Sequence, residues 1–218
     1  MPDGSASRRR QRDRSAAPRP VGPAPAEASL RDAAMAHLAR YGTTEAGMVR
    51  VLDRRIHRWA MRAADAGEPG DQVEQRAKAA RLAARSVAAA LVAAGVLDDA
   101  AYAEARARSL TRAGRSRRAI GAHLGQRGIE PELARASLPE DAEAELAAAL
   151  TQARKRRIGP FRVMADPADD PPDGDDPAAH NRALGMLARA GFSRDVAERA
   201  LSTERDEAER LIAQLKRL

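Results

Sequence analysis

The stretch GVLDDAAYAEARARS, from Gly95 to Ser109, decides the fold because it contains the end of one helix and the beginning of the next. Glycine followed by an apolar residue is typical of a helix end, since glycine adopts the left-handed C′ conformation without strain. Asp98 then predicts an N-cap, and Asp99 falls in the first turn, where negative charge is favourable. The stretch therefore predicts a tight corner between two helices and gives its paired carboxylates a structural role.

The same corner recurs along the chain. In each copy a leucine precedes a glycine by four residues, and in three of the four copies an apolar residue follows that glycine. The glycines, all expected in the left-handed conformation, are Gly42, Gly95, Gly128 and Gly191. The caps expected after them are Thr43 or Thr44, Asp98, Glu130 with Pro131 in the first turn, and Ser193. This self-similarity predicts a helical repeat protein.

The composition also favours an all-α fold. Aromatic residues make up 2% of the 218 residues, and alanine supplies much of the 44% that is hydrophobic. Cores of Ala, Leu and Val suit closely packed helices, whereas sheets favour β-branched and aromatic residues. The periodicity predicts ten helices, at about residues 28–40, 44–66, 71–94, 98–112, 116–126, 131–138, 140–157, 179–190, 194–201 and 204–217.

Two segments are expected to lie outside the helices. Residues 1–27 are rich in Arg, Pro, Ser and Ala and predict a disordered basic arm. Residues 165–177 contain six Asp and four Pro and predict a flexible acidic loop. Two roles stay open for each segment: the arm as a polyanion contact or a solvated tail, and the loop as a mask over a basic surface or an inserted linker.

The chain is strongly basic, with a net charge of +7 and a pI of about 10.7. Such a charge predicts an anionic partner, either nucleic acid or a protein bound to it, the alternative being a merely basic protein. The absence of cysteine excludes disulfides and fits a reducing compartment, so a cytoplasmic location is expected. No apolar run approaches the ~18 residues that span a membrane, and neither a membrane partner nor a secretory signal is expected.

Nothing in the sequence predicts an active site. The four histidines lack metal-ligand spacing, no glycine-rich loop ends in Lys-Ser or Lys-Thr, and no serine lies in a nucleophile motif. A metal-dependent enzyme that uses Asp98 and Asp99 is a weaker alternative, because no further convergent groups accompany them. We therefore expect no enzymatic activity, no catalytic residues, no cofactor and no metal.

Basic residues form three clusters that predict a binding surface. They are Arg55, Arg58 and Arg62 on one helix face; Arg106, Arg108, Arg112, Arg115, Arg117, Arg118 and Arg127 in a stretch without acids; and Arg154, Lys155, Arg156 and Arg157. Unbalanced positive charge repels itself, so its presence indicates an anionic partner, the alternative being an idle surface. With one Trp, two Tyr and two Phe, the stacking of bases on aromatic side chains is not expected to be the main means of DNA binding.

The helices after the corners are acidic or Ala-rich, which favours contacts to the DNA backbone over reading of the base sequence.

The chain resembles the RecX family, the regulators of the recombinase RecA. The resemblance is carried by Gly95-Val96-Leu97-Asp98-Asp99 with Tyr102-Ala103, by RSLTRAGRSRRAIGAHLGQRGI and by EAELAAALTQARKR. The outer stretches LARYGTTEAGMVRVLDRRI and LARAGFSRDVAERAL are similar to the opening and closing units of the family. The structural motif residues are Gly95, Leu97, Asp98, Asp99, Tyr102 and Gly128. Val96 departs from the pattern, since the family usually has an aromatic residue there.

This resemblance implies tandem three-helix repeats that form an elongated, curved helical protein with a basic face. We expect a first repeat unit at residues 28–95, a second at 96–139 and a third at 140–218. The resemblance also implies a non-enzymatic protein that binds the RecA filament on DNA. Such binding inhibits or modulates recombinase and coprotease activity in DNA repair, recombination and the SOS response. We expect a monomer that contacts the backbone of single-stranded or duplex DNA, the runner-up being a basic all-helical DNA-binding protein that acts without RecA.

Overall fold

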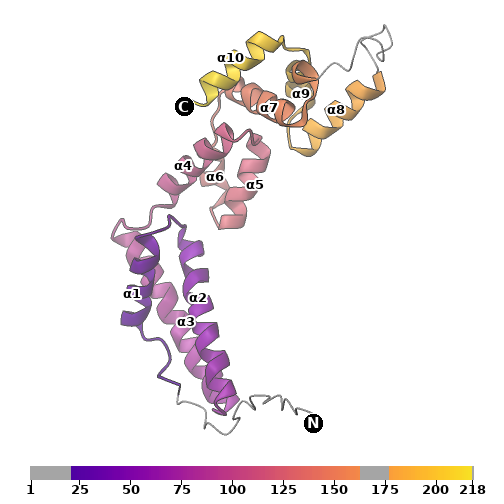
Figure 1. Ribbon diagram of the computed structural model, residues 1–218. Helices are drawn as coiled ribbons and strands as arrows, with labels where there is room; N and C mark the ends of the chain where they lie inside the picture. The colour runs from indigo at the N-terminus through magenta and orange to yellow at the C-terminus, as the bar shows by residue number, and fades with distance from the viewer. Residues whose placement is uncertain (1–20, 163–176, 218) are drawn as a thin grey trace, which may run out of the picture.

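The computed structural model describes residues 21–162 and 177–217, and it confirms the prediction of an all-α protein. These residues form ten α-helices and one short 3₁₀ helix, with no strand among them. The helix bounds lie within two residues of the predicted ones. Figure 1 shows the helices in three successive groups along an elongated molecule.

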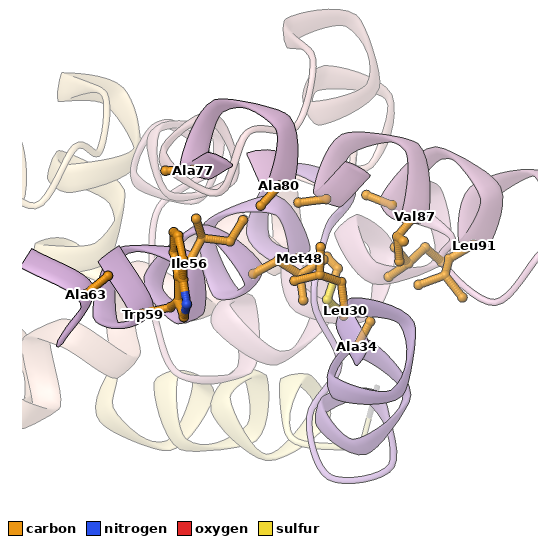
Figure 2. Packing of buried hydrophobic residues seen from close by; sticks show 14 of the residues in the cluster. Leu30, Ala34, Met48, Ile56, Trp59, Ala63, Ala77, Ala80, Val87 and Leu91 are labelled. Atoms are coloured by element: carbon orange, nitrogen blue, oxygen red, sulfur yellow. The ribbon is translucent and has the colours of Figure 1, made fainter. Parts of the chain in front are cut away.

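The first group packs two long helices against each other and adds a short one. α1 spans Glu27–Leu38, α2 spans Glu45–Asp65 and α3 spans Gly70–Ala93. Figure 2 shows their shared core, in which Ile56 and Trp59 of α2 are among the largest side chains. The face of α3 that points into this core is largely alanine, namely Ala77, Ala80, Ala84 and Ala88. Small residues on one helix leave room for large ones on the other, so the two helices approach closely.

The second group is the smallest. α4 spans Asp99–Arg112, α5 spans Arg117–Arg127 and α6 spans Pro131–Ala136. Ile120 and Leu124 of α5 are fully buried and pack with alanines of α4. This core contains few large side chains, so the polar contacts between the second group and its neighbours gain importance for its stability.

The third group has its own core of buried residues. α7 spans Ala142–Arg156, a 3₁₀ helix spans Gly159–Phe161, α8 spans Pro177–Arg189, α9 spans Arg194–Ser202 and α10 spans Arg205–Leu215. The 3₁₀ helix was not predicted, because a single turn of three residues has no apolar periodicity. The large side chains of this core are Leu150, Phe161, Leu187, Phe192 and Ile212. The assignment of the three groups to repeat units with the expected boundaries stays a prediction.

The prediction of left-handed glycines at the corners is confirmed for three of the four. The φ angles are 69°, 89° and 93° at Gly95, Gly128 and Gly191. The prediction is wrong for Gly42, which does not have a positive φ. The reason is that α1 ends at Leu38, so no helix terminus falls at Gly42 and no left-handed C′ residue is needed there.

Three of the predicted caps are confirmed. The side chains of Thr44, Asp98 and Ser193 each accept a hydrogen bond from the main-chain N–H three residues later. Glu130 is the N-cap residue of α6, but its side chain makes no capping hydrogen bond. The start of this helix is instead marked by Pro131 in the first turn, where the missing N–H of proline costs nothing. The corners therefore depend on short polar side chains at the helix N-termini, as the sequence indicated.

The predicted arm and acidic loop fall mostly outside the described residues, namely at 1–20 and 163–176. The arm was predicted to extend to residue 27, and this is wrong for its last part. Val21 and Ala24 pack against the first core, and the indole N–H of Trp59 donates to the carbonyl of Gly22 at 2.9 Å. Glu27 already begins α1. The packing of apolar residues and the hydrogen bond from the indole of Trp59 hold residues 21–26 against the first core. Their composition alone had assigned them to the arm.

Candidate nucleic-acid interface

The first and second groups of helices meet in a polar joint at the N-terminus of α2. The hydroxyl of Thr44, the N-cap of α2, donates to the main-chain carbonyl of Arg127 at 2.7 Å. The carboxylate of Asp99 accepts a hydrogen bond from the main-chain N–H of Glu45 at 2.8 Å. Helix N-termini leave main-chain N–H groups without intrahelical partners, and Asp99 satisfies one of them from another helix. The C-terminus of α5 thus docks on the N-terminus of α2.

The second and third groups meet in a joint with the same chemistry. The hydroxyl of Ser116, the N-cap of α5, donates to the main-chain carbonyl of Ala190 at 2.7 Å. The carboxylate of Glu145 accepts from the main-chain N–H of Arg117 at 3.1 Å. Burial raises the pKa of the Glu145 carboxyl above its usual value, although the Arg117 N–H favours the charged form. The C-terminus of α8 thus docks on the N-terminus of α5.

A glycine allows the close approach at each joint. A Cβ atom at Gly128 would overlap the Cβ of Ala46, and one at Gly191 would overlap the hydroxyl of Ser116. Each glycine directly follows the residue whose carbonyl accepts the hydroxyl bond. The glycine, the carbonyl before it and the capping hydroxyl therefore act as one docking element, used twice in the molecule.

The two joints place α8, α5 and α2 end to end. Figure 1 shows α8, α5 and α2 following one another from the upper right of the view down to its lower part. At each joint the C-terminus of one helix meets the N-terminus of the next, so their dipoles are aligned favourably. Because the contacts are directional hydrogen bonds, they define how the three groups are oriented and hence where their basic side chains lie.

A basic groove with a volume of about 600 Å³ opens beside the first joint, between the turn after α1, helix α2 and helix α4. Four arginines line it, namely Arg50, Arg54, Arg106 and Arg127. Among the described residues that line this groove there is no Asp or Glu. None of the four arginines is ion-paired with a described carboxylate. The basic groove, as defined by these residues, is therefore suited to an anion.

The joint orients one of these arginines. The Nη2 atom of Arg50 donates to the carbonyl of Arg127 at 2.8 Å, and the same carbonyl accepts the Thr44 hydroxyl. A guanidinium group has five N–H donors, so this bond leaves others for a ligand. A phosphate or carboxylate in the basic groove would thus meet a guanidinium whose position is already set.

The positive potential of the basic groove is evident at His123. The Nε atom of Arg106 donates to Nε2 of His123 at 3.2 Å, and this nitrogen can accept only while it carries no proton. Burial lowers the pKa of His123, and the neighbouring charges of Arg106, Arg127 and Arg115 lower it further. Three arginines close enough to disfavour another positive charge provide a field that attracts anions.

Both tyrosines of the chain line the basic groove. Tyr41 is 61% exposed, and its ring centroid lies 5.3 Å from that of His37. Tyr102 is half-buried on α4 and lies across from Gly42, where a Cβ atom would be 3.8 Å from its ring. The groove therefore combines cationic and aromatic side chains in one place.

The predicted basic residues do not all converge on this groove. Only Arg106 and Arg127 line it. Arg55, Arg58 and Arg62 line a second hollow of about 1080 Å³ with residues 21–26. Arg117 and Arg118 line a hollow between α5 and α6, and Arg157 lines one beside α8. The arginines thus occupy several separate hollows along the molecule.

The remaining predicted residues lie outside these hollows. Arg108 is ion-paired with Glu104 at 3.6 Å on the surface of α4. The ammonium group of Lys155 donates to the carbonyl of Ala113 at 2.7 Å, which gives it a part in holding α7 to α4. Arg115, Arg154 and Arg156 are exposed, and Arg112 is half-buried.

Four residues of the basic groove were not among the predicted site residues, namely His37, Tyr41, Arg50 and Arg54. His37 lies on α1, Tyr41 in the turn after it, and Arg50 and Arg54 on α2, whereas Tyr102, Arg106 and Arg127 lie on α4 and α5. Only the joint brings these two sets together, and no local pattern in the sequence predicts it. The sequence does contain one signal, namely that the chain has only two tyrosines. That both line the same groove is visible only in the structure.

The Asp98 and Asp99 carboxylates each bind a main-chain N–H group, of Ala101 and Glu45 respectively. Within the described residues, no group of three or more His, Cys, Asp or Glu side chains could hold a metal ion. Across the same residues, no helix combines the length and the apolar character needed to cross a membrane. The paired carboxylates thus stabilise helix termini.

Comparison with known proteins gives one family. The family model that describes the second three-helix domain of RecX matches residues 98–138. The regulatory protein RecX of Myxococcus xanthus (strain DK1622) is 34% identical over 177 residues, which cover 80% of this chain and 84% of that protein. The regulatory protein RecX of Agrobacterium fabrum is 34% identical over 117 residues, 54% of this chain and 58% of that protein. That of Thermobifida fusca is 37% identical over 112 residues, 50% of this chain and 55% of that protein. No solved structure gives a significant match.

Proposed function

Because this chain belongs to the RecX family of regulatory proteins, we propose that it binds the RecA filament on DNA and inhibits or modulates its recombinase and coprotease activities. It acts by binding and has no catalytic activity of its own. It works in the cytoplasm as a monomer, and its arginines contact the phosphates of the DNA in the filament and acidic groups of RecA.

The observation that supports this proposal most is the basic groove. Its four arginines face a hollow whose described lining contains no acid. An arginine that has no carboxylate partner in the protein itself keeps its charge and its bidentate N–H pairs for an external anion. Contacts to DNA phosphates supply much of the affinity of DNA-binding proteins.

The elongated arrangement of the helix groups also supports an extended partner. The hollow that contains Arg55, Arg58 and Arg62 lies in the first group, and the hollow of Arg117 and Arg118 lies in the second. The basic groove lies where these two groups meet. Basic sites spaced along an elongated molecule suit a filament, whose repeating units present anions at several places.

A non-enzymatic role is supported by what the carboxylates already do. Asp98 caps α4, and Asp99 binds the first N–H of α2. Each carboxylate thus has a structural role through its Oδ1 atom, which favours binding as the function.

The proposal is tested by adding the purified protein to preformed RecA filaments on single-stranded DNA and following ATP hydrolysis. We expect hydrolysis to fall at stoichiometric amounts. The double variant Arg54→Ala with Arg127→Ala should need about tenfold more protein for the same effect. These side chains line the groove, and no described hydrogen bond or ion pair uses their guanidinium groups. The double variant therefore removes two positive charges from the groove and breaks no described hydrogen bond or ion pair of the protein.

A matched control removes the same charge elsewhere. Arg85 of α3 and Arg210 of α10 are exposed and line none of the hollows described above. The double variant Arg85→Ala with Arg210→Ala should inhibit filaments as the unchanged protein does. If the unchanged protein leaves hydrolysis unaffected but binds bare DNA tightly, the chain is instead a DNA-binding protein that acts without RecA.

A further inference from the structure

The two tyrosines both line the basic groove. One comes from the turn after α1 and the other from α4, and they are brought together by the joint between α2 and α5. The chain has five aromatic Trp, Tyr and Phe residues in all. The other three are largely buried in cores, namely Trp59, Phe161 and Phe192. The two aromatic side chains that are not buried in a core therefore both line the basic groove.

Tyr41 is held in place although it is exposed. Its main-chain N–H donates to the carbonyl of His37 at 2.9 Å, and its ring lies beside the imidazole of the same residue. Since 61% of this residue is open to solvent, the ring is accessible to a partner. An ordered and uncovered ring is a platform on which a flat group can stack.

The arginines around this ring suit the phosphates that flank a base. Arg50, Arg54 and Arg106 line the same groove, and Arg50 is fixed by its bond to the joint carbonyl. A volume of about 600 Å³ lies within the ~300–1,000 Å³ of small-molecule sites and has room for a nucleotide. Cationic side chains that follow the backbone, together with aromatic rings under the bases, are the usual means of binding single-stranded nucleic acid.

We infer that the basic groove binds single-stranded DNA, with an unpaired base stacked on Tyr41 and the adjacent phosphates on the groove arginines. The inference rests on the proposed function, because the filament is where this protein meets single-stranded DNA. It adds a role for a base-contacting residue to a surface expected to contact phosphates alone. Paired bases in a duplex are stacked on one another, so their faces are not available to Tyr41. The groove therefore discriminates in favour of unpaired strands.

The test uses the full chain without RecA. Binding to a fluorescein-labelled oligothymidylate and to a duplex of the same length is measured by fluorescence anisotropy. Tyr41→Leu should weaken binding to the single strand by about 5- to 140-fold, the range that corresponds to one stacked base. Tyr41→Phe keeps the ring and should bind within about twofold of the unchanged protein. Duplex binding should change by less than about twofold in both variants, because it depends on phosphate contacts.

The outcomes separate this inference from the proposed function. Equal single-strand binding by Tyr41→Leu and the unchanged protein overturns the inference, whether or not the protein inhibits RecA filaments. An equal loss for single strand and duplex also overturns it, since Tyr41 would then support the groove as a whole. If Tyr41→Leu lowers inhibition of RecA while oligothymidylate binding is unchanged, the ring contacts RecA and the inference is wrong. Loss of single-strand binding alone, restored by phenylalanine, supports it even if RecA proves not to be the partner.

Discussion

The hydroxyl of Thr44 donates to the carbonyl of Arg127, which lies 83 positions further along the chain, at 2.7 Å. The same hydroxyl oxygen accepts from the N–H of Gly47 at 2.9 Å and so caps its own helix. One buried side chain therefore closes the N-terminus of α2 and fastens the second group of helices to the first. Ser116 has the same two roles, 74 positions away from Ala190.

Replacing Thr44 by valine should show how much this hydroxyl contributes to the free energy of unfolding. Valine keeps the shape but removes both hydrogen bonds, so we expect the free energy of unfolding to fall by about 1.5–3 kcal/mol. Unfolding in urea, followed by circular dichroism, measures the loss. Thr44→Ser is the control because serine keeps the hydroxyl, and its loss should stay below about 1 kcal/mol. Equal losses for both variants would mean that the hydroxyl contributes no more to stability than the packing of the methyl group that serine lacks.

Gly128→Ala should destabilise the protein more than Gly67→Ala does. Both glycines have a positive φ, of 89° and 84°, so the backbone strain of about 1–2 kcal/mol is common to both. At Gly67 nothing lies within 4 Å of an added Cβ, whereas at Gly128 the added atom overlaps Ala46 across the joint. We expect the Gly128 variant to lose at least about 1 kcal/mol more in urea unfolding. Similar losses for both variants would mean that the close approach of Gly128 to Ala46 contributes nothing measurable to stability.

The Glu145 carboxyl should make stability depend on pH in the acidic range. Its pKa is raised in the folded protein, chiefly by burial, so the folded state holds a proton that the unfolded state has released. The free energy of unfolding therefore contains a contribution that is complete below the ordinary value of 4.5 and is lost as pH rises through the raised pKa.

Glu145→Gln removes this dependence and keeps an oxygen that can accept from the Arg117 N–H. The stability of the variant relative to the unchanged protein should therefore rise as pH increases above 4.5. Urea unfolding at several pH values measures this difference. A difference that stays constant with pH would show that Glu145 titrates alike in the folded and unfolded states.

The helices could be predicted closely because their signals are local. The leucine periodicity, the capping residues and the glycines at the corners all lie within one or two turns of the boundary that they define. Gly191 shows this, since the left-handed conformation and the cap at Ser193 both follow from five neighbouring residues. Gly42 shows the limit, because the same Leu-x-x-x-Gly pattern occurs where α1 has already ended.

The candidate site could not be predicted in the same way, because it is made by contacts between distant residues. Asp99 was expected to act on the dipole of its own helix, but its carboxylate also binds the N–H of Glu45, 54 positions earlier. This bond and that between Thr44 and Arg127 bring the turn that contains Tyr41 and helix α4 to the same groove. Composition indicated too few aromatic residues for stacking, since it counts side chains and cannot show that two of them line one groove.

His123 should take up a proton when DNA binds. Burial lowers its pKa first, and Arg106, Arg127 and Arg115 lower it further. Phosphates bound to these arginines reduce the positive field, so the pKa of His123 should rise toward its ordinary value of 6.5. An NMR titration of the imidazole with and without oligothymidylate measures the change. Binding should accordingly strengthen as pH falls through 6.5, and an unchanged pKa would place the DNA elsewhere.

The free energy of unfolding of the free protein should depend on pH in the opposite direction to DNA binding. Because the pKa of His123 is lowered on folding, the folded state binds fewer protons than the unfolded state just below pH 6.5. The stability supplied by the neutral imidazole is complete above 6.5 and is lost as pH falls through the lowered pKa. Arg106→Gln removes one positive charge and should raise this pKa, while an unchanged value would mean that Arg106 does not contribute to lowering it.

The salt dependence of DNA binding should show which arginines contact phosphates. Each phosphate contact to a single strand adds about 0.7 to the slope of log Kd against log salt. Arg54→Ala should therefore lower that slope by less than one and weaken binding at low salt, because its guanidinium lies in the basic groove. Arg85→Ala, at an exposed position outside the groove, should leave the slope unchanged.

The charge-reversed variant of Arg115, Arg117 and Arg118 extends this comparison to the second group of helices. Arg117 and Arg118 line a hollow of their own between α5 and α6. If these residues also contact phosphates, the variant should lose filament binding most at low salt, and the loss should shrink as salt rises because fewer phosphate contacts give a shallower salt slope. Unchanged filament binding at low and at moderate salt would exclude these three arginines from the DNA contacts.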